Sequence, residues 1–72
     1  MVYWTAKNNS SFLNTRRSAR TMRAAVIDAR RYLRGELCGE GQIDYYENPG
    51  DVYPIRTDRC DIFTGWQWQV DK

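Results

Sequence analysis

Histidine is absent from the 72 residues, and only two cysteines, Cys38 and Cys60, are present. Without histidine, a general base near neutral pH would have to be a carboxylate or a lysine whose pKa burial shifts strongly. A zinc site would need both thiols together with carboxylates, so we expect no metal and no cofactor. Two cysteines are too few for the disulfide framework of a small secreted protein, and free thiols are expected rather than a bridge.

Catalytic motifs and long apolar runs are missing as well. The chain contains no GxSxG, P-loop, HExxH or CxxC pattern, and we therefore expect that it is not an enzyme. Its start, MVYWTAK, lacks the charged lead and apolar stretch of a signal peptide. No segment approaches the roughly 20 apolar residues of a membrane span. The expectation is a cytoplasmic protein, within the host cell, that makes no membrane contact.

Arginine, by contrast, is concentrated in one segment. Seven arginines lie between residues 16 and 34, where Asp28 is the single acid. At about 100° per residue in a helix, six of the seven fall within roughly 100° of arc, and Arg17 lies just beside it. Apolar residues such as Ala25 and Leu33 occupy the opposite, broader arc. The segment predicts an amphipathic helix with an outward arginine stripe: Arg16, Arg20, Arg23, Arg30, Arg31 and Arg34.

The two halves of the chain carry opposite charge. Residues 1–34 hold eight basic groups and one acid, whereas residues 35–72 hold three basic groups and eight acids, behind a formal net charge of +2. Such asymmetry indicates binding surfaces, although the halves could also neutralise each other within the fold. Asp28, three residues before Arg31, is the one acid within the helix that could pair with the stripe.

Alternation of apolar and polar residues predicts short strands around this helix. Residues 2–7 alternate and predict a strand, followed by a helix over residues 16–37 with Asn14, Thr15 or Ser18 as its N-cap. Three further strands are expected over residues 41–47, 52–57 and 62–70, with a turn at Asn48-Pro49-Gly50-Asp51. Residues 1–72 therefore predict one compact α+β domain of order β-α-β-β-β, in which a single helix packs on one face of a four-stranded, mostly antiparallel sheet.

One helix covers only one face of a sheet, so the other face should be partly exposed. The alternation places Tyr46 on that face, with Tyr3 or Tyr53 as further candidates. The acids of the second half lie in or beside predicted turns, where we expect water to surround them: Asp44, Glu47, Asp51, Asp58 and Asp61. The hairpin thus offers a candidate second contact with a partner: Asp44, Tyr46, Glu47 and Asp51.

The arginine stripe is the leading candidate for binding, because most of its members lack a local acidic partner and repel one another. Guanidinium groups bind phosphate and carboxylate oxygens in a bidentate manner. Ile27, near the middle of the stripe, is an apolar contact better suited to a protein than to bare phosphate. The expected partner-binding residues are Arg16, Arg20, Arg23, Ile27, Arg30, Arg31 and Arg34.

The chain resembles the small phage-encoded anti-CRISPR proteins in its architecture. A strand leads through a Ser/Asn-rich loop into a basic, alanine-rich helix (Ser18-Ala19 through Ala29-Arg30), and an antiparallel sheet follows that ends in an aromatic Gly-Trp strand. The resemblance spans most of the chain and rests on no diagnostic motif, so it transfers no functional residue. It implies a non-catalytic domain that binds a host nucleoprotein complex, such as a CRISPR effector, and blocks its nucleic-acid site.

Two other functions use the same stripe. The first is direct RNA or DNA binding, in which exposed tyrosines would add base stacking; the small overall charge argues against it. The second is self-association through the arginines, and the oligomeric state stays open.

Overall fold

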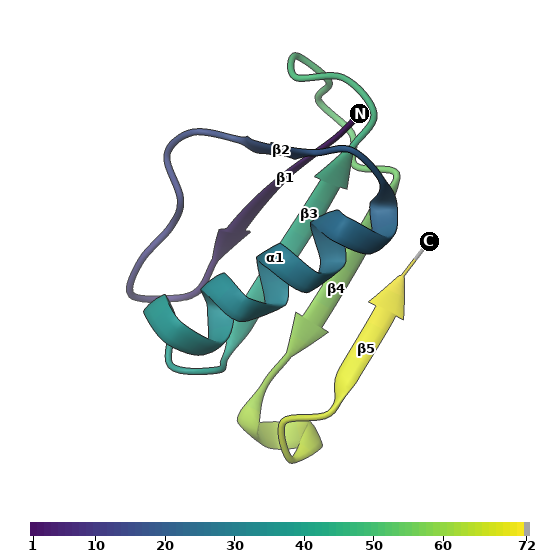
Figure 1. The fold of residues 1–72 in the computed structure, drawn as a ribbon. Coiled ribbons are helices and arrows are strands. Elements are labelled where there is room, and N and C mark those ends of the chain that lie inside the picture. Colours follow the sequence, from purple (N-terminus) through teal and green to yellow (C-terminus); the bar gives the residue numbers. More distant parts are fainter. Residues whose placement is uncertain (72) are drawn as a thin grey trace.

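The computed structural model describes residues 1–71. One antiparallel sheet has the strand order β2-β1-β3-β4-β5, and the helix crosses one of its faces (Figure 1). The α+β class is confirmed, but the sheet has five strands rather than the expected four. The elements are β1 (Val2–Lys7), β2 (Arg17–Ala19), α1 (Met22–Glu36), β3 (Gly41–Tyr46), β4 (Arg56–Cys60), the short 3-10 helix η1 (Ile62–Thr64) and β5 (Trp68–Asp71).

The extra strand, β2, shortens the helix. Residues 17–19 pair with β1, with Ala19 opposite Val2 and Arg17 opposite Trp4. The helix therefore begins at Met22 rather than at residue 16, and none of the three expected N-caps is correct. Thr21 caps it instead, because its side chain accepts a hydrogen bond from the backbone N–H of Ala24. At 15 residues, α1 is about 22 Å long.

The second half of the sheet also differs from the expected ranges. The turn after β3 is confirmed, since the Asp51 N–H donates to the Asn48 carbonyl. Residues 52–55 then stay outside the ladder, and β4 forms only over Arg56–Cys60. Residues 62–66 form η1 and a turn, in which Gly65 and Trp66 both have a positive φ. The expected last strand is consequently confined to Trp68–Asp71.

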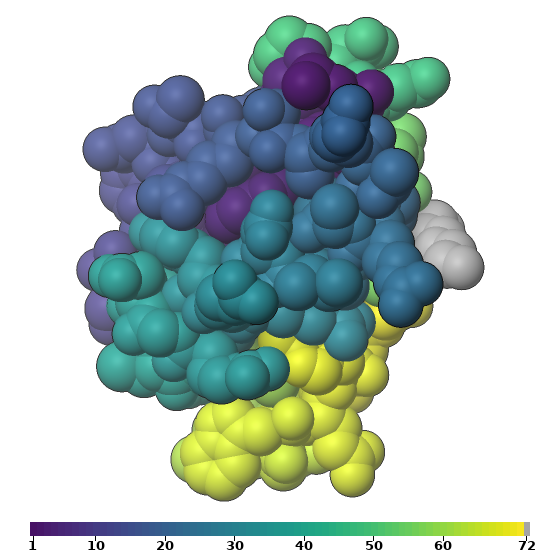
Figure 2. All heavy atoms as spheres, in the orientation of Figure 1, coloured from purple at the N-terminus to yellow at the C-terminus, as the bar shows by residue number. Residues whose placement is uncertain are grey.

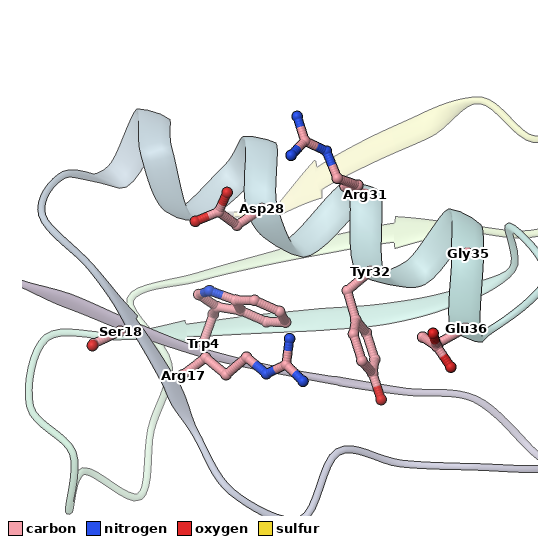
Figure 3. A pocket seen from close by; sticks show the side chains of 8 residues that line it. All are labelled: Trp4, Arg17, Ser18, Asp28, Arg31, Tyr32, Gly35 and Glu36. Atoms are coloured by element: carbon pink, nitrogen blue, oxygen red, sulfur yellow. The ribbon is translucent and has the colours of Figure 1, made fainter.

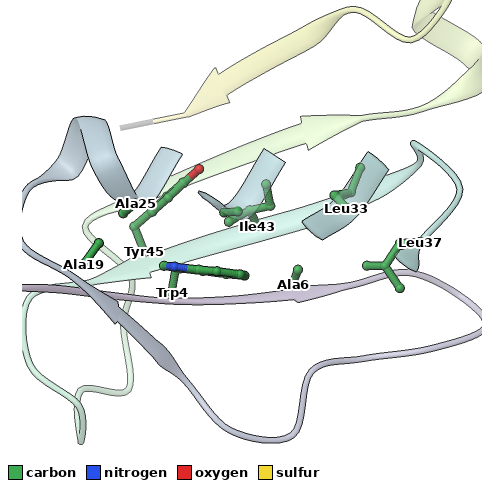
Figure 4. Close-up of a cluster of buried hydrophobic side chains, with 9 residues drawn as sticks. Trp4, Ala6, Ala19, Ala25, Leu33, Leu37, Ile43 and Tyr45 are labelled. Atoms are coloured by element: carbon green, nitrogen blue, oxygen red, sulfur yellow. The ribbon is translucent and has the colours of Figure 1, made fainter. Parts of the chain in front are cut away.

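The core lies between α1 and the centre of the sheet (Figure 4). Ala25 and Ala29 are fully buried on the inner side of α1, where their small side chains let the helix approach β1 closely. Trp4, Ile43 and Tyr45 fill the sheet side of this space. The predicted apolar side of the helix is thus confirmed for α1.

Both cysteines are free thiols, as expected: Cys38 is exposed and Cys60 is buried. Burial raises the pKa of the Cys60 thiol, and the neighbouring Asp61 carboxylate raises it further. In the described part of the chain, no helix has the length and apolar character needed to cross a membrane.

Candidate interaction surface

Four exposed arginines and one exposed isoleucine remain on the outer side of α1 or directly before its start. We call this set the basic face: Arg20, Arg23, Ile27, Arg31 and Arg34. Within the helix, the last four lie inside about 80° of arc, and Arg20 directly precedes the cap. Figure 2 shows the side chains of α1 covering the middle of the face that is turned toward the viewer.

The four arginines of the basic face form no ion pair with any residue among positions 1–71. The expected pairing of Asp28 with Arg31 is therefore wrong, although both residues are exposed. Ile27 is 50 % exposed between these charges. The basic face thus combines uncompensated positive charge with an apolar centre.

Arg30 does not belong to the exposed stripe, contrary to the expectation. Its guanidinium reaches from the flank of α1 to β4, where Nη2 donates to Asp58 Oδ2 at 3.1 Å. It also lies over the Trp68 ring, 4.3 Å from the centroid. Arg30 lies about 100° around the helix from the centre of the buried side. From this flank its side chain reaches β4 and β5, which the helix does not cover.

Asp58 is fully buried, so the expectation of a solvated turn acid is wrong for this residue. Besides Arg30, its carboxylate accepts hydrogen bonds from Arg56 Nε at 2.8 Å and from the Tyr45 hydroxyl at 3.0 Å. Two guanidinium groups offset the cost of burying the charge. Burial raises the pKa of Tyr45, and the Asp58 carboxylate raises it further. This cluster joins α1, β3 and β4.

Arg16 lies before β2 rather than in the helix, and its side chain holds the β3–β4 connection. Its guanidinium donates to the carbonyl oxygens of Asn48, Pro49 and Asp51. The same group stacks on the Tyr46 ring, 3.5 Å from the centroid. These contacts turn Arg16 toward its own chain, away from the basic face.

Arg17 belongs to a shallow cavity of about 460 Å³ between α1 and the β1–β2 pair. Its guanidinium lies between two aromatic rings, 4.9 Å from the Tyr32 centroid and 5.8 Å from the Trp4 centroid (Figure 3). Asp28 and Arg31 lie on the helix side of this cavity, and Arg31 extends away from the sheet. The buried Trp4 Nε1 has no hydrogen-bond partner among the described residues.

The predicted second contact is largely used by the fold itself. Asp44 is buried, and its carboxylate accepts hydrogen bonds from Thr57 Oγ1 at 2.9 Å and Gln42 Nε2 at 3.0 Å. Tyr46 is buried under Arg16, so its expected exposure is wrong. The Asp51 carboxylate accepts from the Asn48 N–H and closes the turn. Of the four residues, only Glu47 is exposed without such a role.

Sequence reasoning missed two features of this surface. The clamp of Arg30 on Asp58 joins residues 28 positions apart, and the spacing of the arginines contains no signal for it. The exposed apolar turn at Ile62, Phe63 and Trp66 was hidden in a predicted strand. Its signal was present in the sequence, because Asp61 and Thr64 have the spacing of a cap and Asp61 Oδ1 accepts from the Thr64 N–H.

No group of three or more His, Cys, Asp or Glu side chains that could hold a metal ion occurs within residues 1–71. Comparisons with protein-family models, with curated proteins and with solved structures gave no match for this chain.

Proposed function

We propose that the chain is a non-catalytic interaction module of phage or mobile-element origin that inhibits a host nucleoprotein complex of the CRISPR-effector kind. The basic face of α1 binds an anionic surface of that complex and blocks the access of nucleic acid. The observation that carries the proposal is the set of four exposed arginines that form no ion pair within residues 1–71. Mutual repulsion of unpaired charges costs stability, and an anionic partner would relieve it.

The centre of the basic face favours a protein component of such a complex. Ile27 is half exposed and flanked by Arg23 and Arg31, one helical turn away on each side. An apolar residue ringed by guanidinium groups fits an acidic protein surface with an apolar depression. Bare phosphate offers nothing for the isoleucine to contact.

Capture from a nuclease-treated lysate of the natural host tests this proposal. The tagged chain is expected to retain a stoichiometric nucleoprotein partner, identified by mass spectrometry. The double variant Arg31→Glu with Arg34→Glu should lose that partner. The matched control is Lys7→Glu with Arg59→Glu, which makes the same charge change on the opposite face of the sheet. Absence of a partner, or equal capture by both variants, contradicts the proposal.

Direct RNA or DNA binding is the second candidate, and it uses the same arginines. Four phosphate contacts would weaken duplex binding by about three to four powers of ten for each tenfold rise in salt. Arg16 covers the ring of Tyr46, which is therefore not available for base stacking, whereas Tyr53 is exposed and is available for it. Titration with short duplexes and single strands at low salt distinguishes the candidates: no association rules out the second one.

A further inference from the structure

Exposed apolar side chains are concentrated in the last third of the chain. Of the ten large apolar side chains that are exposed in the described residues, seven lie between positions 52 and 70. Phe63, in the turn before β5, is 94 % exposed, and Val70, on β5 itself, is 44 % exposed. The seven form two groups, residues 52–55 and the 62–66 turn, at opposite ends of the β4–β5 pair, with Val70 between them. The seven are Val52, Tyr53, Ile55, Ile62, Phe63, Trp66 and Val70.

β5 forms this edge of the sheet (Figure 1). It pairs with β4 on one side only, so the backbone groups on its other side have no strand partner. Proteins usually protect such an edge with lysine, proline or a bulge. β5 is short and ends in the charged Asp71, but Trp68, Gln69 and Val70 carry no charge, proline or bulge. The helix packs mainly on β1, β2 and β3 and reaches β5 only through Arg30, which lies over Trp68.

We propose that two copies of the chain form a two-fold dimer through antiparallel pairing of β5 with β5. The residue faces restrict the pairing to registers in which the two-fold axis passes through a residue pair. Trp68 lies opposite Cys60 and Val70 opposite Asp58, so both point to the helix side of the sheet, whereas Gln69 points to the other side. Placing Gln69 across from Gln69 of the second copy keeps both helix sides on one face of a continuous sheet.

This register is complementary along its whole length. Trp68 of each copy lies across from Val70 of the other, which makes two aromatic–aliphatic pairs on the helix side. The two Gln69 side chains meet on the open side, where their amides can exchange hydrogen bonds. Asp71 lies across from Gln67 of the second copy, so no like charges face each other directly.

The antiparallel arrangement also gathers the remaining exposed apolar residues. The 62–66 turn lies at one end of the β4–β5 pair and residues 52–55 lie at the other end. Two-fold pairing brings the turn of each copy to the end of the sheet that carries residues 52–55 of the other. Both copies of α1 lie on the same side of the joined sheet, so the dimer presents two basic faces in one direction.

Molecular mass in solution tests the dimer. Light scattering after size exclusion, over about 1 µM to about 1 mM chain, is expected to show a species of twice the 8.5 kDa chain mass. Val70→Lys should raise the dimer dissociation constant by at least about a hundredfold, since the symmetry introduces the charge twice. Ser18→Lys places the same charge on β2, the opposite edge, and should leave the dimer unchanged. Far-UV circular dichroism checks that both variants fold.

Cysteine cross-linking tests the register independently of affinity. Residues directly opposite in an antiparallel pair have Cα atoms about 4.5–5.5 Å apart, within the reach of a disulfide. In a Cys38→Ser background, Gln69→Cys should form covalent dimers on mild oxidation, whereas Ser18→Cys should stay monomeric.

Three results would overturn the dimer: a monomer throughout the concentration range, a dimer that Val70→Lys does not weaken, or equal cross-linking at positions 18 and 69.

Salt dependence distinguishes the β5 dimer from self-association through the basic face. A β5 dimer persists at about 1 M salt, where the Debye length is roughly 3 Å, whereas an assembly held by arginines dissociates. None of these outcomes depends on the proposed inhibitor function, because that function is tested by capture of a different molecule.

Discussion

Arg30 and Asp58 form an ion pair of 3.1 Å that connects the basic half of the chain to its acidic half. The pair ties the flank of α1 to β4, a strand outside the main contacts of the helix. It explains why internal neutralisation of the two halves is partial. One arginine of the stripe pairs with a buried carboxylate, while those of the basic face stay exposed.

Removal of the Asp58 charge should destabilise the fold strongly. Asp58→Asn leaves the guanidinium groups of Arg30 and Arg56 close together without a counter-charge, and we expect a loss of about 3 kcal/mol in the free energy of unfolding. That loss approaches the total of roughly 3–5 kcal/mol that a domain of this size has. Urea unfolding measures it. Asp28→Asn, the same change on the exposed side of α1, should shift the midpoint little, and equal effects would contradict this role of Asp58.

Arg16 is expected to keep the β3–β4 connection in place. Arg16→Ala removes its hydrogen bonds to the backbone oxygens of residues 48, 49 and 51 and uncovers Tyr46. We expect a loss of about 1.5 kcal/mol in the free energy of unfolding, which is the lower end of the range for hydrogen bonds made by a charged group. Hydrogen exchange at the Asp51 and Ile55 amides should accelerate. Arg20→Ala is the control, and faster exchange in both variants would argue against a specific clamp.

Gly41 should not tolerate a side chain. Its φ is +154°, and an added Cβ would lie 2.5 Å from the Lys7 carbonyl oxygen, on the neighbouring strand β1. Gly41→Ala is therefore expected to cost about 1–3 kcal/mol through backbone strain. Gly50→Ala introduces the same methyl group where nothing lies within 4 Å, so its thermal midpoint should stay close to that of the parent protein. A parent-like midpoint for Gly41→Ala would refute the close approach.

Stability should fall in alkaline solution. Burial raises the pKa values of Cys60 and Tyr45 above their ordinary values of 9.0 and 10.0, so the folded chain holds protons that the unfolded chain releases. The free energy of unfolding therefore keeps its full value below about pH 9 and decreases as the pH rises through 10. Urea unfolding as a function of pH measures the slope.

Two substitutions test whether Tyr45 causes the loss of stability above about pH 10. Tyr45→Phe should start from a lower stability, because the hydrogen bond to Asp58 is lost, and should then decline less steeply above about pH 10. The exposed Tyr53, changed to Phe, should leave the slope as it is. A Tyr45→Phe protein that keeps the parent slope would exclude Tyr45 as the titrating group.

The helical pattern in the sequence predicted the structure correctly where contacts between residues close in the chain determine it. The inner positions Ala25, Ala29 and Leu33 lie where the period of the helix predicts them. The start of the helix was wrong, because Arg17 and Ala19 pair with residues at the beginning of the chain. Helix periodicity reflects local geometry and does not reveal a strand partner 13 or more residues away along the chain.

β4 was misplaced for a related reason. Its inward positions are Arg56, Asp58 and Cys60, which give no apolar alternation, whereas the preceding residues 52–55 form a short apolar run, Val-Tyr-Pro-Ile. The Asp58 cluster replaces the usual apolar contacts with ion pairs from outside the strand. The hydrophobic pattern therefore indicated a strand several residues too early. Because the pattern did not reveal the buried Asp58, it also gave no reason to expect that Arg30 turns toward the sheet.

The interior position of β1 in the sheet determines when the sheet can be completed. β1 lies between β2 and β3, and its pairing with β3 joins residues 3 and 46. During synthesis, β1 therefore has to wait until residues 41–46 have left the ribosome before its main partner exists. The β3–β4 and β4–β5 pairs, by contrast, join segments that are close in sequence. Closure of the long loop between β1 and β3 is accordingly the step that should limit the folding rate.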